Sequence, residues 1–132
     1  YGIVNRGAWC DNDAIQRDSK SSPTALKAIL CTGLPAGMNH SAEEFQVLIS
    51  VFGHFGKIRM LGSAALMLCY VASGQVDSYW ERQIALWDVG AALAIVQAAG
   101  GVIEFSEPDN NNRLEVKAAA CEHLLVSKVD GH

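Results

Sequence analysis

The chain has 132 residues, of which 50% are hydrophobic and 18% are charged, and its formal net charge is −4. This length suits one domain, and an acidic chain without a basic stripe is not expected to bind nucleic acid. No apolar run reaches the roughly 18 residues that a membrane-spanning helix needs, so we expect no membrane partner. A mean hydropathy of +0.15 is high for so small a domain, which predicts that part of its apolar surface meets another chain.

Short strands and one helix are predicted for the first part of the chain. Residues 1–10 predict two strands around an Asn-Arg-Gly turn, and residues 14–16 and 25–35 predict one further strand each. Ser41 and Glu44 have the spacing of a capping box, in which each side chain accepts a hydrogen bond from the other residue's backbone. The helix that follows has four apolar side chains at helical spacing, namely Phe45, Leu48, Ile49 and Phe52.

Strands and helices alternate in the rest of the chain. The predicted elements are a strand at 57–61, a helix at 64–73 opened by Gly62-Ser63 and closed by Gly74, a strand at 75–81, a crossover at 82–86, a helix at 89–99 ended by Gly100-Gly101, strands at 101–107 and 114–121, and a last helix from residue 122. The helices at 64–73 and 89–99 are apolar on nearly every face, which is typical of helices buried between layers. The alternation predicts the α/β class, with a layered α/β sandwich in a single domain over residues 1–132.

Cysteine and histidine spacing predicts no metal site of its own. Cys10, Cys31, Cys69 and Cys121 form no CxxC pair and no Cys/His zinc spacing, and the four histidines are irregularly placed. We therefore expect four thiols rather than disulfides, and a reducing, cytoplasmic location.

Three places have side chains suited to chemistry. Asp88 stands where a helix N-cap belongs, and it is read either as that cap or as a carboxylate ligand for Mg²⁺. Gly62, Ser63 and Ala64 begin a helix, and Ser63 is either a plain cap or part of an anion or hydroxyl site at the helix start. Glu81 ends a strand, where it is either solvated or an acceptor for substrate hydroxyls.

Two stretches of the chain resemble a known family. IRMLGSAALMLCYVASGQVDSYWE, followed by WDVGAALAIVQAAGG, is similar to the C-terminal half of the inositol monophosphatase family, which belongs to the lithium-sensitive, magnesium-dependent phosphatases. Trp87-Asp88 matches the family's Trp-Asp motif, and Ala99 to Gly101 match its Ala-Gly-Gly. Residues 62–65 match its Gly-Ser/Thr-Ala-Ala helix start, and the opening YGIVNRGAWCDN resembles its hairpin.

The resemblance implies a mixed sheet with buried helices and a Mg²⁺-dependent hydrolysis of a phosphomonoester. Asp88 would be a metal ligand, Gly62, Ser63 and Ala64 would contact the substrate, and Glu81 would bind an inositol hydroxyl. The implied partner is a small phosphorylated polyol or sugar, with inositol favoured by the spacing from Glu81 to Asp88.

The family's first motif, Asp-Pro-hydrophobic-Asp-Gly-Thr/Ser, is absent from this sequence, as is the glutamate that precedes it. We therefore assign no catalytic residue and expect the 132-residue chain, a truncated domain without the N-terminal metal-binding half, to hydrolyse phosphate esters negligibly by itself. The alternative is a non-catalytic assembly or polyol-binding module derived from such a phosphatase. Either way we expect an exposed apolar face that packs on an N-terminal half or forms a homodimer or larger homo-oligomer.

Overall fold

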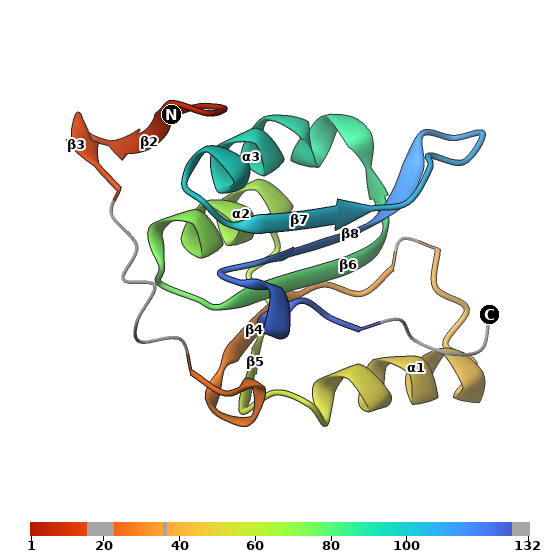
Figure 1. Cartoon of the computed structure of the whole chain (residues 1–132). Helices are drawn as coiled ribbons and strands as arrows, with labels where there is room; N and C mark the ends of the chain where they lie inside the picture. The colour runs from red at the N-terminus through yellow and green to blue at the C-terminus, as the bar shows by residue number, and fades with distance from the viewer. Residues whose placement is uncertain (16–22, 36, 128–132) are drawn as a thin grey trace.

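The computed structural model describes residues 1–15, 23–35 and 37–127 of the chain. Its centre is a five-stranded mixed sheet with the strand order β5-β4-β6-β8-β7 (Figure 1). β4 pairs in parallel with β5 and β6, while β8 pairs antiparallel with β6 and β7. The strands are β4 (Ile29–Thr32), β5 (Lys57–Arg59), β6 (Ser78–Ala85), β7 (Val102–Phe105) and β8 (Arg113–Ala119).

Helices cover both faces of this sheet, which confirms the layered α/β class. Figure 1 shows α2 (Ala64–Ser73) and α3 (Leu86–Ala98) together on one face and α1 (Ala42–Phe52) on the other. A small antiparallel sheet of β1 (Gly2–Ile3), β2 (Gly7–Cys10) and β3 (Asp13–Ala14) packs on α3 through β1 and β2. A Cβ atom at Gly2 would lie 3.0 Å from the Cβ of Ala98, so glycine allows this close approach.

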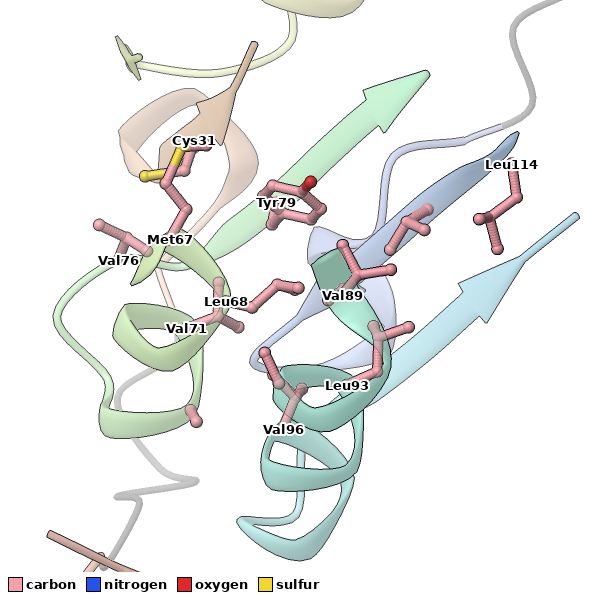
Figure 2. Close-up of a cluster of buried hydrophobic side chains, with 14 residues drawn as sticks. Cys31, Met67, Leu68, Val71, Val76, Tyr79, Val89, Leu93, Val96 and Leu114 are labelled. Atoms are coloured by element: carbon pink, nitrogen blue, oxygen red, sulfur yellow. The ribbon is translucent and has the colours of Figure 1, made fainter. Parts of the chain in front are cut away.

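Alternating side chains of the central strand β6 divide the core in two. Tyr79 points towards α2 and α3, where it joins the main cluster around Met67, Leu68 and Val96 (Figure 2). Trp80 points towards α1 and packs in a second cluster with Leu30, Leu48, Val51 and Val126. Because successive strand residues face opposite sides of a sheet, two neighbouring aromatic residues anchor two separate cores.

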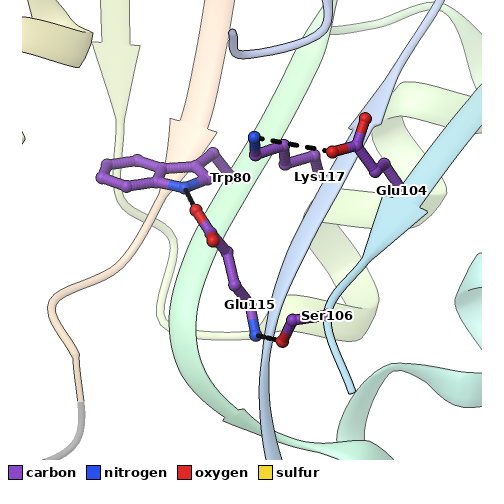
Figure 3. A network of polar contacts seen from close by, with 5 residues as sticks. All are labelled: Trp80, Glu104, Ser106, Glu115 and Lys117. Atoms are coloured by element: carbon purple, nitrogen blue, oxygen red, sulfur yellow. Dashed lines mark hydrogen bonds and ion pairs between the residues drawn. The ribbon is translucent and has the colours of Figure 1, made fainter. Parts of the chain in front are cut away.

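The sheet face that carries Trp80 also holds a polar network (Figure 3). The indole Nε1 of Trp80 donates to Glu115 Oε1 at 2.8 Å, and the Ser106 hydroxyl accepts from the Glu115 backbone N–H at 2.9 Å. Lys117 lies opposite both Trp80 and Glu104 in the strand register. Its side chain is only 7% exposed, and its Nζ lies 3.8 Å from Glu104 Oε1, so the partly desolvated ammonium has a carboxylate partner.

Two helices begin at the serines that the sequence indicates. Ser41 accepts a hydrogen bond from the Glu44 backbone N–H at 3.2 Å, but the Glu44 carboxylate accepts from the Asn39 N–H instead, so the capping box is half formed. Ser63 accepts from the Leu66 N–H at 3.2 Å and starts α2 in the same way. Gly74 ends α2 with a φ of 82°, a left-handed conformation that glycine adopts without strain.

Three expectations about the ends of elements are wrong. The predicted crossover at 82–86 is mostly strand, because β6 continues to Ala85 in its pairing with β8. α3 therefore begins at Leu86 with Ala85 as its N-cap residue, so Asp88 lies within the first turn and is not the cap. In place of a last helix from residue 122, the described residues form one 3₁₀ turn, Glu122–Leu124, because the chain packs Leu124 and Val126 into the core.

Predicted burial of the helices is only partly right. In α1 the buried residues are Leu48 and Val51, whereas Ile49 is 67% exposed and Phe45 is also exposed, because the helix meets the sheet along a narrow line. α2 and α3 bury the side that faces the sheet, but Leu66 and Trp87 in their first turns are exposed. These exposed first turns lie at one edge of the sheet, beside the cleft described below.

All four cysteines lie among the described residues, and each is a thiol rather than half of a disulfide, as expected. In the part of the chain that the structure describes, no helix combines the length and the apolar character that crossing a membrane requires.

Candidate functional site

A cleft of about 480 Å³ opens where the parallel strands end. β4, β5 and β6 run in the same direction, so their carboxyl ends share one edge of the sheet, and α2 and α3 begin at that edge after β5 and β6. The predicted site residues therefore meet here although they are far apart in sequence. The cleft is lined by Gly33, Leu34, Gly62, Ser63, Ala64, Ala65, Glu81, Ile84 and Asp88.

A β-bulge in β6 shapes the floor of the cleft. The register with β8 shifts between Glu81 and Ile84, and Gln83 has a φ of 58°. The Arg113 guanidinium donates to the Gln83 carbonyl at 3.1 Å and supports this turn of the backbone. Bulges redirect strand side chains, and this one allows Glu81 and Ile84 to line the same cleft.

Glu81 is a buried carboxylate, not the solvated strand end that was one reading of it. The residue is 8% exposed, and Glu81 Oε2 accepts a hydrogen bond from the Tyr79 hydroxyl at 2.8 Å. Burial raises the pKa of the Glu81 carboxyl, the hydrogen bond from Tyr79 partly opposes this, and the negative charge of Asp88 raises the pKa further. Burial, followed by the nearby Glu81, raises the pKa of the Tyr79 hydroxyl, which thus stays a proton donor.

Gly33 leaves the space that the Glu81 carboxylate occupies. A Cβ atom on Gly33 would overlap Glu81 Oε1. Gly33 and Tyr79 were not among the site residues predicted from the sequence. The available signal was a glycine directly after the buried strand β4, which marks a close approach of another group to the backbone.

The start of α2 forms one wall of the cleft. Gly62 has a φ of 77°, and Ser63 caps the helix through Leu66, so the cap reading of Ser63 is confirmed. Its role towards a substrate stays a prediction. The backbone N–H groups of a helix's first turn and the positive end of its dipole favour an anion at this wall.

Asp88 lines the cleft from the first turn of α3. The N-cap residue of α3, Ala85, makes no side-chain capping bond, and Asp88 is exposed to solvent within the cleft. An exposed carboxylate whose oxygens are not needed for capping suits a hard cation such as Mg²⁺. Its role as a metal ligand stays a prediction.

Two carboxylates, Asp88 and Glu81, are the acidic groups that line the cleft. Over residues 1–15, 23–35 and 37–127, no group of three or more His, Cys, Asp or Glu side chains lies close enough to hold a metal ion. This donor set provides one exposed carboxylate for a metal, and Mg²⁺ sites add water and substrate phosphate to such ligands.

Comparison with known proteins identifies the family. The sequence model that defines the inositol monophosphatase family matches residues 1–127 of this chain. The chain is 41% identical over 102 residues to an inositol-1-monophosphatase of Rhizobium meliloti, and 34% identical over 108 residues to human inositol monophosphatase 2. Among solved structures, the inositol monophosphatase of Anabaena (Nostoc) sp. PCC 7120 matches 90% of the chain with a TM-score of 0.73 and 31% identity. The chain belongs to the inositol monophosphatase family.

The match extends over part of each relative. The aligned region covers 76% of this chain but 38% of the Rhizobium meliloti protein, and 77% of this chain but 36% of the human protein. It covers 49% of the Anabaena chain. The described fold thus corresponds to less than half of each of these relatives. The chain can therefore be compared with their sites only over the aligned part.

Replacing Glu81 by Gln is expected to stabilise the fold more at pH 7 than at pH 4. Gln keeps an oxygen that accepts from Tyr79 but removes the buried charge. Because the folded-state pKa of Glu81 is raised, ionisation destabilises the parent as pH rises from the unfolded-state pKa of about 4.3 through the folded-state value. Urea unfolding of parent and Glu81→Gln at both pH values measures the difference.

The exposed Glu107 provides the control for this substitution. Glu107→Gln removes a charge of the same kind from an exposed position, so it controls for the change in net charge. An equal effect of Glu81→Gln at pH 4 and pH 7 would contradict the raised pKa.

Replacing Gly33 by Ala is expected to destabilise the fold by about 1–3 kcal/mol, because the new methyl group displaces Glu81 and breaks its bond to Tyr79. Gly90→Ala is the matched control: it lies within α3, and its Cβ would meet no atom within 4 Å. That change is expected to stabilise by roughly 0.5–1 kcal/mol, since alanine favours helix. Thermal or urea unfolding of the two variants and the parent measures both changes in stability. Equal changes in the two variants would refute the steric argument.

Proposed function

We propose that the cleft is the substrate side of a Mg²⁺-dependent site that hydrolyses a phosphomonoester of inositol or a similar polyol. The observation that carries this proposal is the meeting of an exposed carboxylate, a buried carboxylate and two helix starts in one cleft of a chain from the inositol monophosphatase family. The relatives named above support inositol phosphate as the substrate class.

The two helix starts supply the phosphate-binding chemistry. Ser63 at the N-cap of α2 and Asp88 in the first turn of α3 both line the cleft, so the positive ends of both helix dipoles lie at its walls. Phosphate oxygens placed there accept hydrogen bonds from the backbone N–H groups of Ala64 and Ala65, which have no carbonyl partner within their own helix.

Glu81 supplies the polyol-binding chemistry. Its carboxylate lies at the cleft floor, fixed by Tyr79 and by the packing against Gly33. A substrate hydroxyl that donates to this carboxylate replaces the water lost on burial and gains a charge-assisted hydrogen bond. A substrate without that hydroxyl excludes water from the carboxylate and offers it no donor beyond Tyr79, which gives selectivity for polyols.

Asp88 would hold Mg²⁺ together with the substrate phosphate. When bound, the ion activates water and stabilises the developing charge on the phosphate oxygens. Such sites need further ligands, and no cluster of three acidic or imidazole groups is present over the described ranges. The 132-residue chain by itself is therefore expected to bind the substrate without appreciable hydrolysis.

The same observation favours a second candidate, a polyol-binding or assembly module without catalysis. A chain that keeps Glu81 and the two helix starts but relies on one exposed carboxylate for metal retains recognition and lacks turnover. Both candidates predict that the chain binds the phosphorylated polyol. They differ in whether hydrolysis is restored when another chain supplies further carboxylates for the metal.

The first test is Mg²⁺-dependent phosphate release and binding with inositol monophosphate. With the chain alone, no release above background is expected from the parent, Asp88→Ala or Asp13→Ala, the last being an exposed carboxylate on β3, away from the cleft. In ¹H–¹⁵N NMR spectra, inositol monophosphate with Mg²⁺ is expected to shift Gly33, Gly62 and Ala64 in the parent and Asp13→Ala, and to shift them less in Asp88→Ala.

The outcomes of this test are distinct. Shifts outside the cleft, or none at all, would refute the proposed site. Phosphate release that Asp88→Ala loses and Asp13→Ala keeps would mean that another copy of the chain completes the metal site, and the expected inactivity would be wrong.

Exposed apolar side chains surround the cleft and support self-association of the chain. These residues are Leu34, Met60, Leu61, Leu66, Leu86 and Trp87, and they are at least two-fifths exposed. Apolar surface gathered at one edge of a fold favours contact with another chain. We propose that these six residues form the contact between two copies of the chain.

Replacing Trp87, which is 68% exposed, by Ser is expected to shift the chain towards monomer in sedimentation velocity experiments. Leu26→Ser is the control, because Leu26 is 71% exposed but precedes β4, at the other end of that strand. A parent that is monomeric at all concentrations, or an equal effect of both variants, would contradict the assignment.

A further inference from the structure

The loop between β7 and β8 lies at the same edge of the sheet as the cleft. β8 begins at Arg113, which pairs with the last residue of β6, and α3 begins directly after that residue. The loop of residues 106–112 therefore approaches the junction between β6 and α3. This junction separates the two carboxylates of the proposed site, because Glu81 precedes it and Asp88 follows it.

Two hydrogen bonds attach the loop to this junction. The Arg113 guanidinium donates to the Gln83 carbonyl at 3.1 Å. The Asn112 carbonyl accepts from the Leu86 backbone N–H at 3.0 Å. Leu86 is the first residue of α3, and the N–H groups of a helix's first turn have no carbonyl partner within the helix. The loop thus supplies an acceptor at a helix start that has no side-chain cap.

The Asp109 carboxylate fixes the shape of the loop. Its Oδ1 accepts from the backbone N–H groups of Asn111 at 2.8 Å and Arg113 at 2.9 Å. The Asp109 backbone N–H donates to the Arg113 carbonyl at 2.8 Å, and the Asp109 carbonyl accepts from the Asn112 N–H at 3.0 Å. One residue therefore determines where the Asn112 carbonyl and the Arg113 guanidinium lie.

The two carboxylates of the cleft are held by different means. Glu81 is fixed from the core, by the Tyr79 hydroxyl and by the space at Gly33. Asp88 lies in a helical turn that begins with the exposed Leu86, and the bond from Leu86 to the loop determines where this turn starts relative to β6. The distance between the two carboxylates therefore depends on the loop.

We propose that the loop between β7 and β8 determines the specificity of the cleft, with Asp109 and Arg113 as positioning residues that hold Asp88 at the distance from Glu81 that a phosphorylated polyol fits. This inference rests on the proposed function, in which Glu81 accepts from a substrate hydroxyl and Asp88 holds Mg²⁺ with the phosphate. The separation of the two groups then selects the spacing between hydroxyl and phosphate in the substrate. Inorganic phosphate has no hydroxyl to place on Glu81, so its binding does not depend on this separation.

The first measurement needs no ligand. Replacing Asp109 by Ala removes the acceptor of two loop N–H groups, and hydrogen exchange of the Leu86 N–H is expected to become at least about fivefold faster, as for the loss of one net hydrogen bond. Asp109→Asn keeps Oδ1 and is expected to retain most of the protection. The buried Leu93, later in α3, reports opening of the whole fold, and its exchange is expected to change less.

The second measurement compares two ligands in the presence of Mg²⁺. NMR titrations with inositol monophosphate and with inorganic phosphate, followed at Gly33 and Gly62, give the ratio of the two dissociation constants. The parent is expected to prefer inositol monophosphate, and Asp109→Ala and Arg113→Ala are expected to lower this preference about tenfold, while Asp109→Asn keeps it. A variant that is merely less stable binds both ligands more weakly and keeps the ratio.

Asn110→Ala is the matched control, because Asn110 is exposed in the same loop and takes part in none of the bonds described above. Its Leu86 exchange and its ligand preference are expected to equal those of the parent. If Asp109→Ala unfolds, Arg113→Ala, which keeps the loop carboxylate, decides.

The outcomes separate this inference from the proposed function. Unchanged Leu86 exchange in a folded Asp109→Ala would overturn the inference. So would an unchanged ligand preference in both alanine variants of the loop, or an equal loss in Asn110→Ala. A parent that binds neither ligand in the cleft would refute the proposed function and the specificity with it, while Leu86 exchange would still show whether the loop holds α3.

Discussion

The hydrogen bond from the Tyr79 hydroxyl to the Glu81 carboxylate connects the core of the molecule to its cleft. Tyr79 is fully buried among the residues of α2 and α3, and Glu81, two residues on, faces the same side of β6. A buried carboxylate needs a donor to remain ionised at acceptable free energy, and it needs room, which Gly33 leaves on β4's side. The position of the polyol-binding group in the proposed site is therefore set by core packing, and not by a surface loop.

Local sequence patterns were sufficient to predict most of the elements, because the signals they use are local. Ser41, Ser63 and Gly74 end or begin helices through bonds within four residues, and the structure places them so. The start of α3 had no such signal. Ala85 and Leu86 are ordinary helix residues, and the strand before them is prolonged by its pairing with β8, which lies about thirty residues further along the chain.

The residues of the candidate site were identified by motif, while their meeting place follows from topology. Gly62, Glu81 and Asp88 come together because β4, β5 and β6 are parallel and end at one edge. Gly33 was missed because its importance depends on a side chain nearly fifty positions away. His123 Nε2 lies 3.0 Å from the carbonyl oxygen of Pro23, a residue 100 positions away, and no spacing rule along the chain reveals a contact of that kind.

The place of β4 in the middle of the parallel strands also affects how the chain folds. β4 precedes the other four strands of the five-stranded sheet in sequence, and its register pairs Leu30 with Ser78, so its neighbour β6 is made only after α1, β5 and α2. Closing such a distance is entropically unfavourable until many contacts form at once, which makes folding slow. In a growing polypeptide, the fully buried Leu30 and Cys31 remain on an unpaired strand edge throughout that interval. The topology thus leaves this segment open to pairing with other chains until β6 has been made.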